Sequence, residues 1–469
     1  MSTPETRAAS DTAMALFASV SSPPTFVSTP SEEDQPAMAP VRVEERVTAL
    51  DTVRGFALLG ILLMNITSFG LPEAAYSNPV PAGGSAGLNL FTWSFITIVG
   101  EGKMRAIFSL AFGASVCLLI ERLSGKGLAA SAADIHYRRM LWLLLFGLIH
   151  GYFIWGGDIL FPYAMMGLLL YPLRKLSARA LLSAAAVMLL VMTGDALREY
   201  FHQKDLHRKY VQIEADEKSG KKLTAEQEDI KKEWQDDLTD FSPSAEQLKK
   251  ETDAHLGGYL KLFAFRAKDV YRFHSHPIYF PWPWYDILSM MLVGMALLKL
   301  GVLTGSLSTR FYVWMALFSF AIGLPAHAWW VWSYIKSNFS LDSWNFTGVA
   351  YEIGRITAFG YIAVLVLAVK SGRLRPLTRT LAYVGQMAFS NYILTSLVCT
   401  TIFEGYGFGL FGKLQRYQLY GVVLAVWAMI LIISPIWLKH FRFGPLEWLW
   451  RSLTYWRKQP LRIRDQALA

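Results

Sequence analysis

The chain has 469 residues, of which 53% are hydrophobic and 17% charged, with a formal net charge of +9. An average soluble domain carries roughly 25% charged residues, so this composition excludes an ordinary soluble enzyme. Apolar runs recur that are long enough to cross a hydrocarbon layer roughly 30 Å thick. The sequence therefore predicts a protein of the lipid bilayer. Its excess positive charge is interpreted as a topology signal and not as a nucleic-acid site.

Residues 1–45 are rich in Ser, Thr, Pro and Ala and are predicted to be disordered. Apolar segments follow and predict an all-α polytopic bundle of ten spans, with eleven as the open alternative. They lie at about 53–70, 105–122, 138–153, 158–173, 180–196, 284–301, 311–334, 350–369, 381–403 and 418–440. Residues 89–103 are also apolar, but a full span there would reverse every later loop. We expect this segment to be a re-entrant or interfacial helix.

The basic residues favour one orientation of the bundle. Loops on one side contain Arg122, Lys126, Arg138 and Arg139 among others, whereas the short loops on the other side contain few cations. Because Lys and Arg accumulate in cytoplasmic loops, both termini of this multi-pass protein are predicted to be cytoplasmic.

Residues 197–282 form a charged insert that carries 31 of the 81 charged residues. Its charges alternate in the manner of a solvated helical hairpin, and its last residues are aromatic, as at a membrane interface. We expect an extracytoplasmic helical domain that says little about chemistry. It separates a first transmembrane group, 46–196, from a second, 283–440, and 441–469 is predicted to be a basic cytoplasmic tail.

Polar side chains form a stripe along the first span. Asp51 and Arg54 are three residues apart, and Asn65 lies eleven residues beyond Arg54, which is almost three helical turns and about 16 Å along the axis. Polar groups inside a membrane are costly, about 2.5 to 3.5 kcal/mol on insertion scales, so they indicate a function or an internal partner. A local ion pair between Asp51 and Arg54 is the structural alternative.

A second polar pair is predicted at the turn between the third and fourth segments. Residues 155–157 form a tight connection, which brings His150 and Asp158 together. A histidine oriented by a carboxylate is typical of general-base catalysis. A hydrogen bond from His150 to a helix carbonyl is an equally weighted alternative. Glu352 and Arg355 are spaced as an internal ion pair. Cys117 and Cys399 lie in apolar runs, and no metal is expected.

The same residues resemble the bacterial YeiB family, long described only as a domain of unknown function. The resemblance rests on Leu50–Asn65, Phe108–Gly113, Phe146–His150, Trp155–Leu160, Gly385–Tyr392 and Phe443–Tyr455, with Gln386 where the family has Arg. Asp51, Arg54, Gly55 and Asn65 are also similar to the opening stripe of the heparan-α-glucosaminide N-acetyltransferase family. There a histidine in the next outer loop assists catalysis. Residues 68–88 contain no histidine, and His150 is our proposed substitute.

This resemblance implies a transmembrane acyltransferase of the bacterial inner membrane that takes acyl-CoA or acetyl-CoA from the cytoplasm and modifies an unknown acceptor in the periplasm or outer leaflet. The predicted catalytic residues are His150, Asp158 and Asn65. The predicted CoA-binding residues are Asp51, Arg54, Lys103, Arg105, Arg138 and Arg139. Lys103 and Arg105 would join this set only if 89–103 dips deep, and would otherwise face the acceptor. The predicted acceptor-binding residues are Glu101, Trp155, Tyr163, Asn391 and Tyr392.

A secondary transporter of a small metabolite or ion is the alternative function, because intramembrane ionisable groups also suit transport. Against it, the two transmembrane groups show no convincing repeat. A membrane scaffold is less favoured, since a scaffold needs no costly polar stripe. The sequence is also compatible with a homodimer.

Overall fold

The computed structural model describes residues 48–463, except 126, 129, 276–282 and 342–346. These residues belong to one compact unit, Val41–Ala469. The predicted disordered segment 1–45 lies outside the described residues. The described chain folds into helices, and its β pairing is one isolated bridge between Phe441 and Arg462. The predicted all-α class is confirmed.

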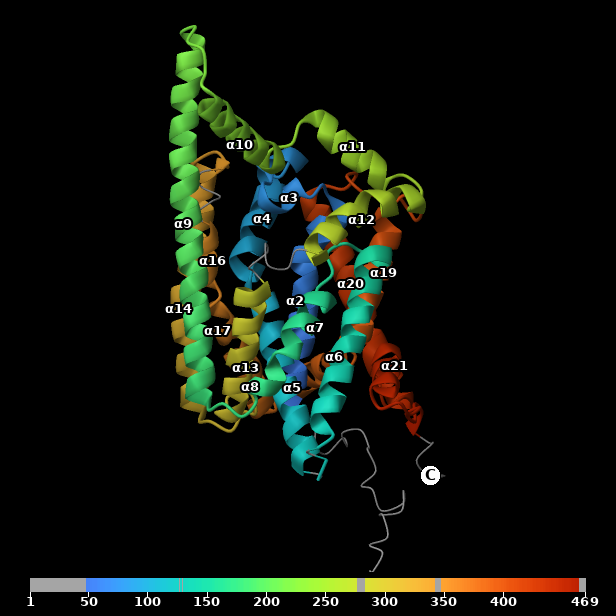
Figure 1. Cartoon of the computed structure of the whole chain (residues 1–469). Coiled ribbons are helices and arrows are strands. Elements are labelled where there is room, and N and C mark those ends of the chain that lie inside the picture. Colours follow the sequence, from blue (N-terminus) through green and yellow to red (C-terminus); the bar gives the residue numbers. More distant parts are fainter. Residues whose placement is uncertain (1–47, 126, 129, 276–282, 342–346, 464–469) are drawn as a thin grey trace, which may run out of the picture. The chain divides into compact units, whose positions relative to one another are not determined.

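All ten predicted segments are helical (Figure 1). They are α2 (Thr48–Gly70), α5 (Lys103–Gly125), α6 (Ala132–Ile149), α7 (Leu160–Leu168) with α8 (Leu170–Leu173), α9 (Ala178–Lys218), α13 (Ser289–Lys299), α14 (Thr309–Lys336), α16 (Thr347–Gly354) with α17 (Thr357–Ser371), α18 (Arg375–Gln386) with α19 (Ala388–Phe403), and α20 (Arg416–His440). Six helical stretches of the described chain are long and apolar enough to cross a membrane. The chain is thus an all-α membrane protein, and the number of spans stays a prediction.

The segment predicted to be re-entrant is α4 (Gly87–Gly100). It is joined to α5 by Glu101 and Gly102, and the φ of +74° at Gly102 is a left-handed conformation that glycine adopts readily. Trp93 of α4 packs against Trp330 and Tyr334 of α14. The helix therefore lies within the bundle beside α14, and its insertion from one side of the membrane stays a prediction.

Two glycines allow α2 and α18 to cross in close contact. A Cβ at Gly55 would lie 1.9 Å from the Leu381 carbonyl oxygen, and one at Gly385 would lie 2.0 Å from the Asp51 carbonyl oxygen. Small residues let membrane helices approach closely where lipid is as apolar as the side chains. The crossing also brings Arg54 to the Gly385 carbonyl, to which Nη1 donates a hydrogen bond at 3.2 Å.

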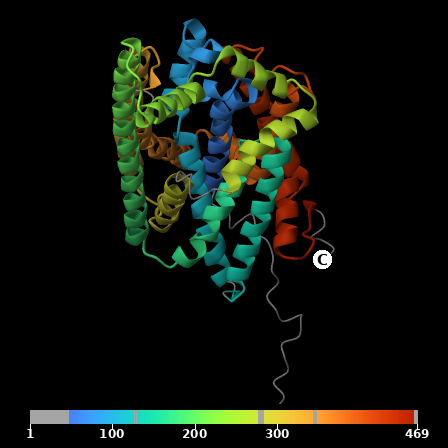
Figure 2. The same cartoon turned by 45° about the horizontal axis from the view of Figure 1, so that its top comes forward.

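The charged insert consists of the second half of α9, α10 (Ala225–Phe241), α11 (Ala245–His255) and α12 (Tyr259–Ser275). The 41 residues of α9 span about 60 Å, so this helix continues out of the first transmembrane group. It pairs with α10 as the predicted hairpin. α11 and α12 then run across one end of the bundle (Figure 2), where α12 contacts the π-helical turn η4 (His150–Ile154). The half of the insert that consists of α11 and α12 therefore covers this end of the bundle.

The basic C-terminal tail contains a helix, α21 (Pro445–Thr454). α21 packs against α6 and α19, and the Trp450 indole donates a hydrogen bond to the Arg139 carbonyl at 2.9 Å. The described part of the tail, up to residue 463, is thus attached to the bundle.

Gly55→Ala is expected to lower the free energy of unfolding by about 1–3 kcal/mol, because the added methyl group overpacks the crossing of α2 and α18. Thermal unfolding of the detergent-solubilised protein measures the effect. Gly421→Ala in α20 is the matched control, since a Cβ there meets nothing within 4 Å. Equal melting temperatures for the two variants would contradict a tight crossing.

Candidate functional site

His150 and Asp158 are in direct contact, as the short turn predicts. His150 Nδ1 lies 2.8 Å from Asp158 Oδ1, and both side chains are buried. An ionised carboxylate only accepts hydrogen bonds, so in the neutral imidazole the proton lies on Nδ1. Nε2 is then an acceptor, and the hydroxyl of Ser396 in α19 donates to it at 2.9 Å. The three side chains form a buried Ser–His–Asp chain.

Local backbone structure holds this chain in place. Asp158 caps the beginning of α7, because its carboxylate accepts hydrogen bonds from the N–H of Leu160 at 3.1 Å and of Phe161 at 2.7 Å. His150 opens η4, in which the Trp155 N–H donates to the His150 carbonyl at 2.9 Å. Such widened turns are frequent at functional sites. The carboxylate and the ring are therefore fixed before any ligand binds.

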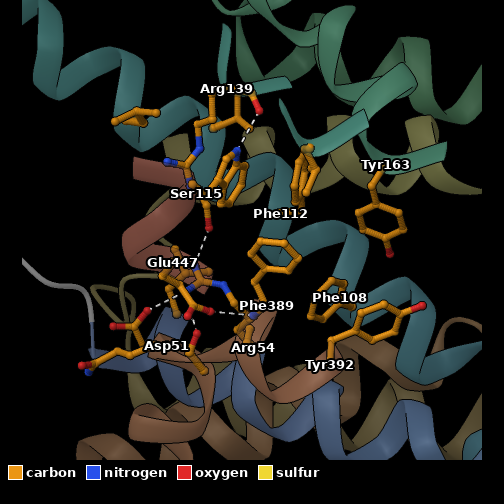
Figure 3. Close-up of a pocket in the computed structure, with 18 of the residues that line it drawn as sticks. Asp51, Arg54, Phe108, Phe112, Ser115, Arg139, Tyr163, Phe389, Tyr392 and Glu447 are labelled. Atoms are coloured by element: carbon orange, nitrogen blue, oxygen red, sulfur yellow. Dashed lines mark hydrogen bonds and ion pairs between the residues drawn. The ribbon is translucent and has the colours of Figure 1, made fainter. Parts of the chain in front are cut away.

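A cavity of about 230 Å³ lies between α2, α5, α6, α19 and α21 (Figure 3), and is named here the arginine cavity. Its charged lining residues are Arg54, Arg122, Arg139, Arg451, Asp51 and Glu447. Aromatic rings form much of the remaining wall, from Phe108, Phe112, Tyr163, Phe389 and Tyr392. The cavity thus combines an excess of cations with an apolar interior.

Hydrogen bonds and stacking orient two of these arginines. Arg54 Nη1 lies 2.8 Å from Asp51 Oδ1, and Nη2 donates to the Ser115 hydroxyl at 2.5 Å. The predicted Asp51–Arg54 ion pair is therefore present. The Arg139 guanidinium lies 3.7 Å from the centre of the Trp450 ring. A guanidinium stacked in this way has less side-chain freedom to lose when it binds an anion.

Glu447 of α21 connects the C-terminal tail to the arginine cavity. Its Oε1 accepts hydrogen bonds from the N–H groups of Phe389 at 2.7 Å and Ser390 at 3.0 Å, at the beginning of α19. A carboxylate there is stabilised by the helix dipole. Phe443–Tyr455 is one of the segments that carry the family resemblance, and Glu447 is its only acidic residue. The sequence pattern predicted no function for Glu447.

A second cavity of about 420 Å³, named here the carboxylate cavity, is lined by Asp158, whereas His150 and Ser396 line neither cavity. Six carboxylates line it: Glu73, Glu101, Asp158, Glu251, Asp269 and Glu404. Arg105, Arg266 and His255 also line it, as do the predicted residues Asn65 and Trp155. The two cavities share two lining residues, Ile61 and Ile159.

The insert forms part of the carboxylate cavity. α11 and α12 supply seven of its lining residues, namely Glu251, His255, Phe265, Arg266, Asp269, Val270 and Phe273. Arg266 donates to the carbonyls of Ile154 at 2.7 Å and Tyr152 at 3.0 Å, and so caps η4. An arginine can satisfy carbonyl oxygens at a helix end in this way. From its charge pattern we expected the insert to say little about chemistry, but its lining residues make it part of the cavity wall.

Two of the predicted acceptor-binding residues, Tyr163 and Tyr392, line the arginine cavity and not the carboxylate cavity. Glu101 and Arg105 line the carboxylate cavity and a third cavity beside it, of about 430 Å³. Arg105 Nε lies 2.6 Å from Asp286 Oδ2, and Asp286 also pairs with Arg355. Arg105 is therefore grouped with the carboxylate cavity and not with Arg54 and Arg139. The predicted Glu352–Arg355 ion pair is present.

Lys103, Arg138 and Asn391 line none of the three cavities. Lys103 is buried and donates to the Thr97 carbonyl at 3.3 Å. Arg138 lies on a different face of α6 from Arg139, since one residue corresponds to a rotation of about 100°. Its side chain pairs with Asp134 at 2.5 Å. Asn391 donates hydrogen bonds to α18 and α20. Lys103 and Arg138 were predicted to bind CoA together with Arg54 and Arg139, but they do not line the arginine cavity.

Sequence reasoning missed several residues that line these sites. No functional role was predicted for Ser396 of the Ser–His–Asp chain, or for the cavity residues Ser115, Arg122, Arg451, Glu447 and those of α11 and α12. Ser396 lies 246 residues from His150, and a serine in an apolar segment is common. Arg122 and Arg451 were visible only as basic residues near helix ends.

These features define an all-α membrane protein in which two cavities of different charge share two lining residues beside a buried Ser–His–Asp chain. Residues 297–457 match the family described as "Protein of unknown function (DUF418)". The chain is 32% identical over 421 residues to the uncharacterized protein YeiB of Escherichia coli (strain K12), covering 87% of this chain and 96% of YeiB. It is 29% identical over 445 residues to the uncharacterized protein YxaH of Bacillus subtilis (strain 168), covering 91% and 98%. The chain belongs to the YeiB family. No solved structure matches it significantly.

The carboxylate cavity generates a prediction for pH dependence. Burial, and then the nearby Glu251, raise the pKa of Glu73, and burial raises the pKa of Glu251. A raised pKa means that the folded state binds protons more tightly than the unfolded chain. The stabilising contribution of these two groups is then fully present below the ordinary value of 4.5 and is lost as the pH rises through the raised values.

Glu251→Gln keeps an acceptor for the Glu73 N–H, which lies 2.8 Å from Glu251 Oε1, and removes the charge. We expect this variant to lose less stability than the wild type as the pH rises above 4.5, measured as melting temperature in detergent. Glu226→Gln on the exposed face of α10 is the control. Parallel pH profiles for all three proteins would contradict the prediction.

Proposed function

We propose that the protein is an integral membrane acyltransferase of the bacterial inner membrane. It moves an acyl group from cytoplasmic acyl-CoA to an acceptor at the outer side. The observation that carries this proposal is the pair of cavities, one rich in arginine and one in carboxylates, which share Ile61 and Ile159. Tyr392 of the first cavity packs against the His150 ring, and Asp158 lines the second. Such a pair suits a donor and an acceptor that approach the same residues from opposite sides.

The arginine cavity fits the donor. CoA carries several phosphate charges, and arginine offers paired donors that match phosphate oxygens. Four arginines against two carboxylates leave an excess of positive charge, and the aromatic wall suits an uncharged pantetheine arm and acyl group. Arg122 and Arg139 belong to the loop region whose positive charge predicts the cytoplasmic side. This supports a donor that docks from the cytoplasm.

The carboxylate cavity fits an acceptor with a hydroxyl or amino group and no negative charge. Six carboxylates exceed the cations of that cavity, so an anionic acceptor would be repelled. His150, with Asp158 behind it, is the base that accepts a proton during transfer. Asn65 lines the same cavity and is the proposed donor to a developing oxyanion, a role worth roughly 10²- to 10³-fold in rate.

Arg139→Gln is expected to weaken CoA binding about tenfold or more, because a hydrogen bond to a charged group contributes about 1.5–3 kcal/mol. Calorimetric titration of CoA and acetyl-CoA into the detergent-solubilised protein measures the affinity. Arg138→Gln is the matched control, since the neighbouring guanidinium pairs with Asp134 outside the cavity. Equal affinities for the two variants would contradict the assignment of the donor site.

His150→Gln is expected to retain acetyl-CoA binding and to reduce transfer by roughly 10²- to 10⁴-fold, because glutamine can still donate to Asp158 but cannot act as a base. The assay uses proteoliposomes with acetyl-CoA on one side and ethanolamine, glycerol or glucosamine on the other. Wild-type protein that neither binds acetyl-CoA nor transfers its acetyl group would overturn the proposed function.

Secondary transport is the second candidate, favoured by one observation. Arg105, Asp286, Arg355 and Glu352 form a continuous chain of ion pairs inside the bundle. Intramembrane ion pairs are frequent in proton and ion pathways. Counterflow of a solute through proteoliposomes without any acyl donor would support transport. Accumulation that depends on acetyl-CoA would support acyl transfer.

A further inference from the structure

We propose that Ser396 is the nucleophile that carries the acyl group between the two cavities, as an acyl ester on its hydroxyl. This inference rests on the proposed acyltransferase function and adds a catalytic residue and a two-step mechanism to it. The observation that carries it is the position of Ser396 on the free side of the imidazole, at 2.9 Å from His150 Nε2.

The hydrogen bonds give each side chain one role. Asp158 accepts from His150 Nδ1, which leaves the lone pair of Nε2 directed at the Ser396 hydroxyl at 2.9 Å. The same hydroxyl also lies 3.3 Å from the Tyr392 carbonyl oxygen, a longer and therefore weaker interaction for its one proton. The nucleophile, the base and the orienting carboxylate are each within hydrogen-bond reach, which is the arrangement that activates a serine. A histidine that acted directly on the acceptor would need Nε2 free. Here the serine occupies it.

The location of Ser396 also fits transfer of the acyl group from one cavity to the other. Ser396 lies one helical turn, about 6 Å, after Tyr392 on the same face of α19. Tyr392 lines the arginine cavity, and its ring packs 5.0 Å from the His150 ring. On the other side, Trp155 and Asp158 line the carboxylate cavity. The Ser396–His150 pair therefore lies behind the wall of each cavity.

Ser396 is 1% exposed, so a neighbouring group moves in this mechanism, and we assign that movement to Tyr392, one turn before it in α19. Two long hydrogen bonds hold the Tyr392 hydroxyl: it accepts from the Ile159 N–H at 3.3 Å and donates to the Gly157 carbonyl at 3.5 Å. Rotation of the ring would open the arginine cavity toward the serine and release the Ile159 N–H as a donor for the oxyanion. The closed ring would then protect the ester from water.

In the first step, the Ser396 hydroxyl gives its proton to His150 Nε2 while its oxygen bonds to the thioester carbonyl carbon. The C–S bond breaks, the electron pair goes to sulfur, and His150 returns the proton so that CoA leaves as the thiol. In the second step, the acceptor hydroxyl or amine attacks the ester carbon and gives its proton to Nε2. The bond from carbon to the serine oxygen breaks, and His150 reprotonates Ser396.

The test uses purified full-length protein and acetyl-CoA without acceptor. We expect a burst of CoA thiol equal to the amount of protein and a mass increase of one acetyl group, mapped by peptide mass spectrometry to Ser396. Addition of an acceptor should remove the label. This measurement on the wild type does not depend on the folding of any variant.

Variants separate a nucleophile from a positioning residue. Ser396→Ala should bind acetyl-CoA normally but show neither burst nor label. Ser396→Cys should form a thioester that neutral hydroxylamine cleaves. Thr401→Ala, which removes an exposed hydroxyl bonded one turn back on the same helix, is the control and should behave like wild type.

Two outcomes would overturn the inference. Transfer at the wild-type rate in Ser396→Ala, or transfer with no acetyl group on Ser396 at any stage, would show direct attack by the acceptor and leave the proposed function intact. Absence of both acetyl-CoA binding and transfer in the wild type would remove the proposed function together with this mechanism.

Discussion

The Asp158 carboxylate is the interaction on which the rest of the site depends. It accepts from two backbone N–H groups at the beginning of α7 and from His150 at the end of α6. An unpaired carboxylate inside a helical membrane bundle is costly, so α6 and α7 are held in the one arrangement that supplies all three donors. Ile159, which follows Asp158 in the chain, lines both cavities, so the same junction contributes to the wall of each.

Local sequence features predicted the helices and the polar pairs that are close in sequence. Apolar runs give the ten helical segments, and helical spacing gives Asp51 with Arg54 and Glu352 with Arg355. A short turn brings His150 to Asp158. These predictions succeed because each depends on a few consecutive residues and on fixed helix geometry.

Contacts between distant helices could not be predicted in this way. Ser396 meets His150 only because α19 packs beside η4, and Glu447 reaches α19 only because the C-terminal tail folds back onto the bundle. Arg138 and Arg139 look equivalent in the sequence, yet the rotation of one helix decides which of them lines a cavity. In the insert, an alternating charge pattern cannot distinguish a solvated helix from α11 and α12, which cover a polar cavity.

The two isoleucines that line both cavities bear on whether acyl transfer moves charge across the membrane. Ile61 and Ile159 place branched hydrocarbon between two polar compartments, and hydrocarbon opposes the passage of ions. Under the proposed function, an acyl group is the only part of the donor that crosses, and it carries no charge. Each turnover would therefore be electroneutral. Its rate should not respond to the membrane potential, and the proton gradient would not be discharged.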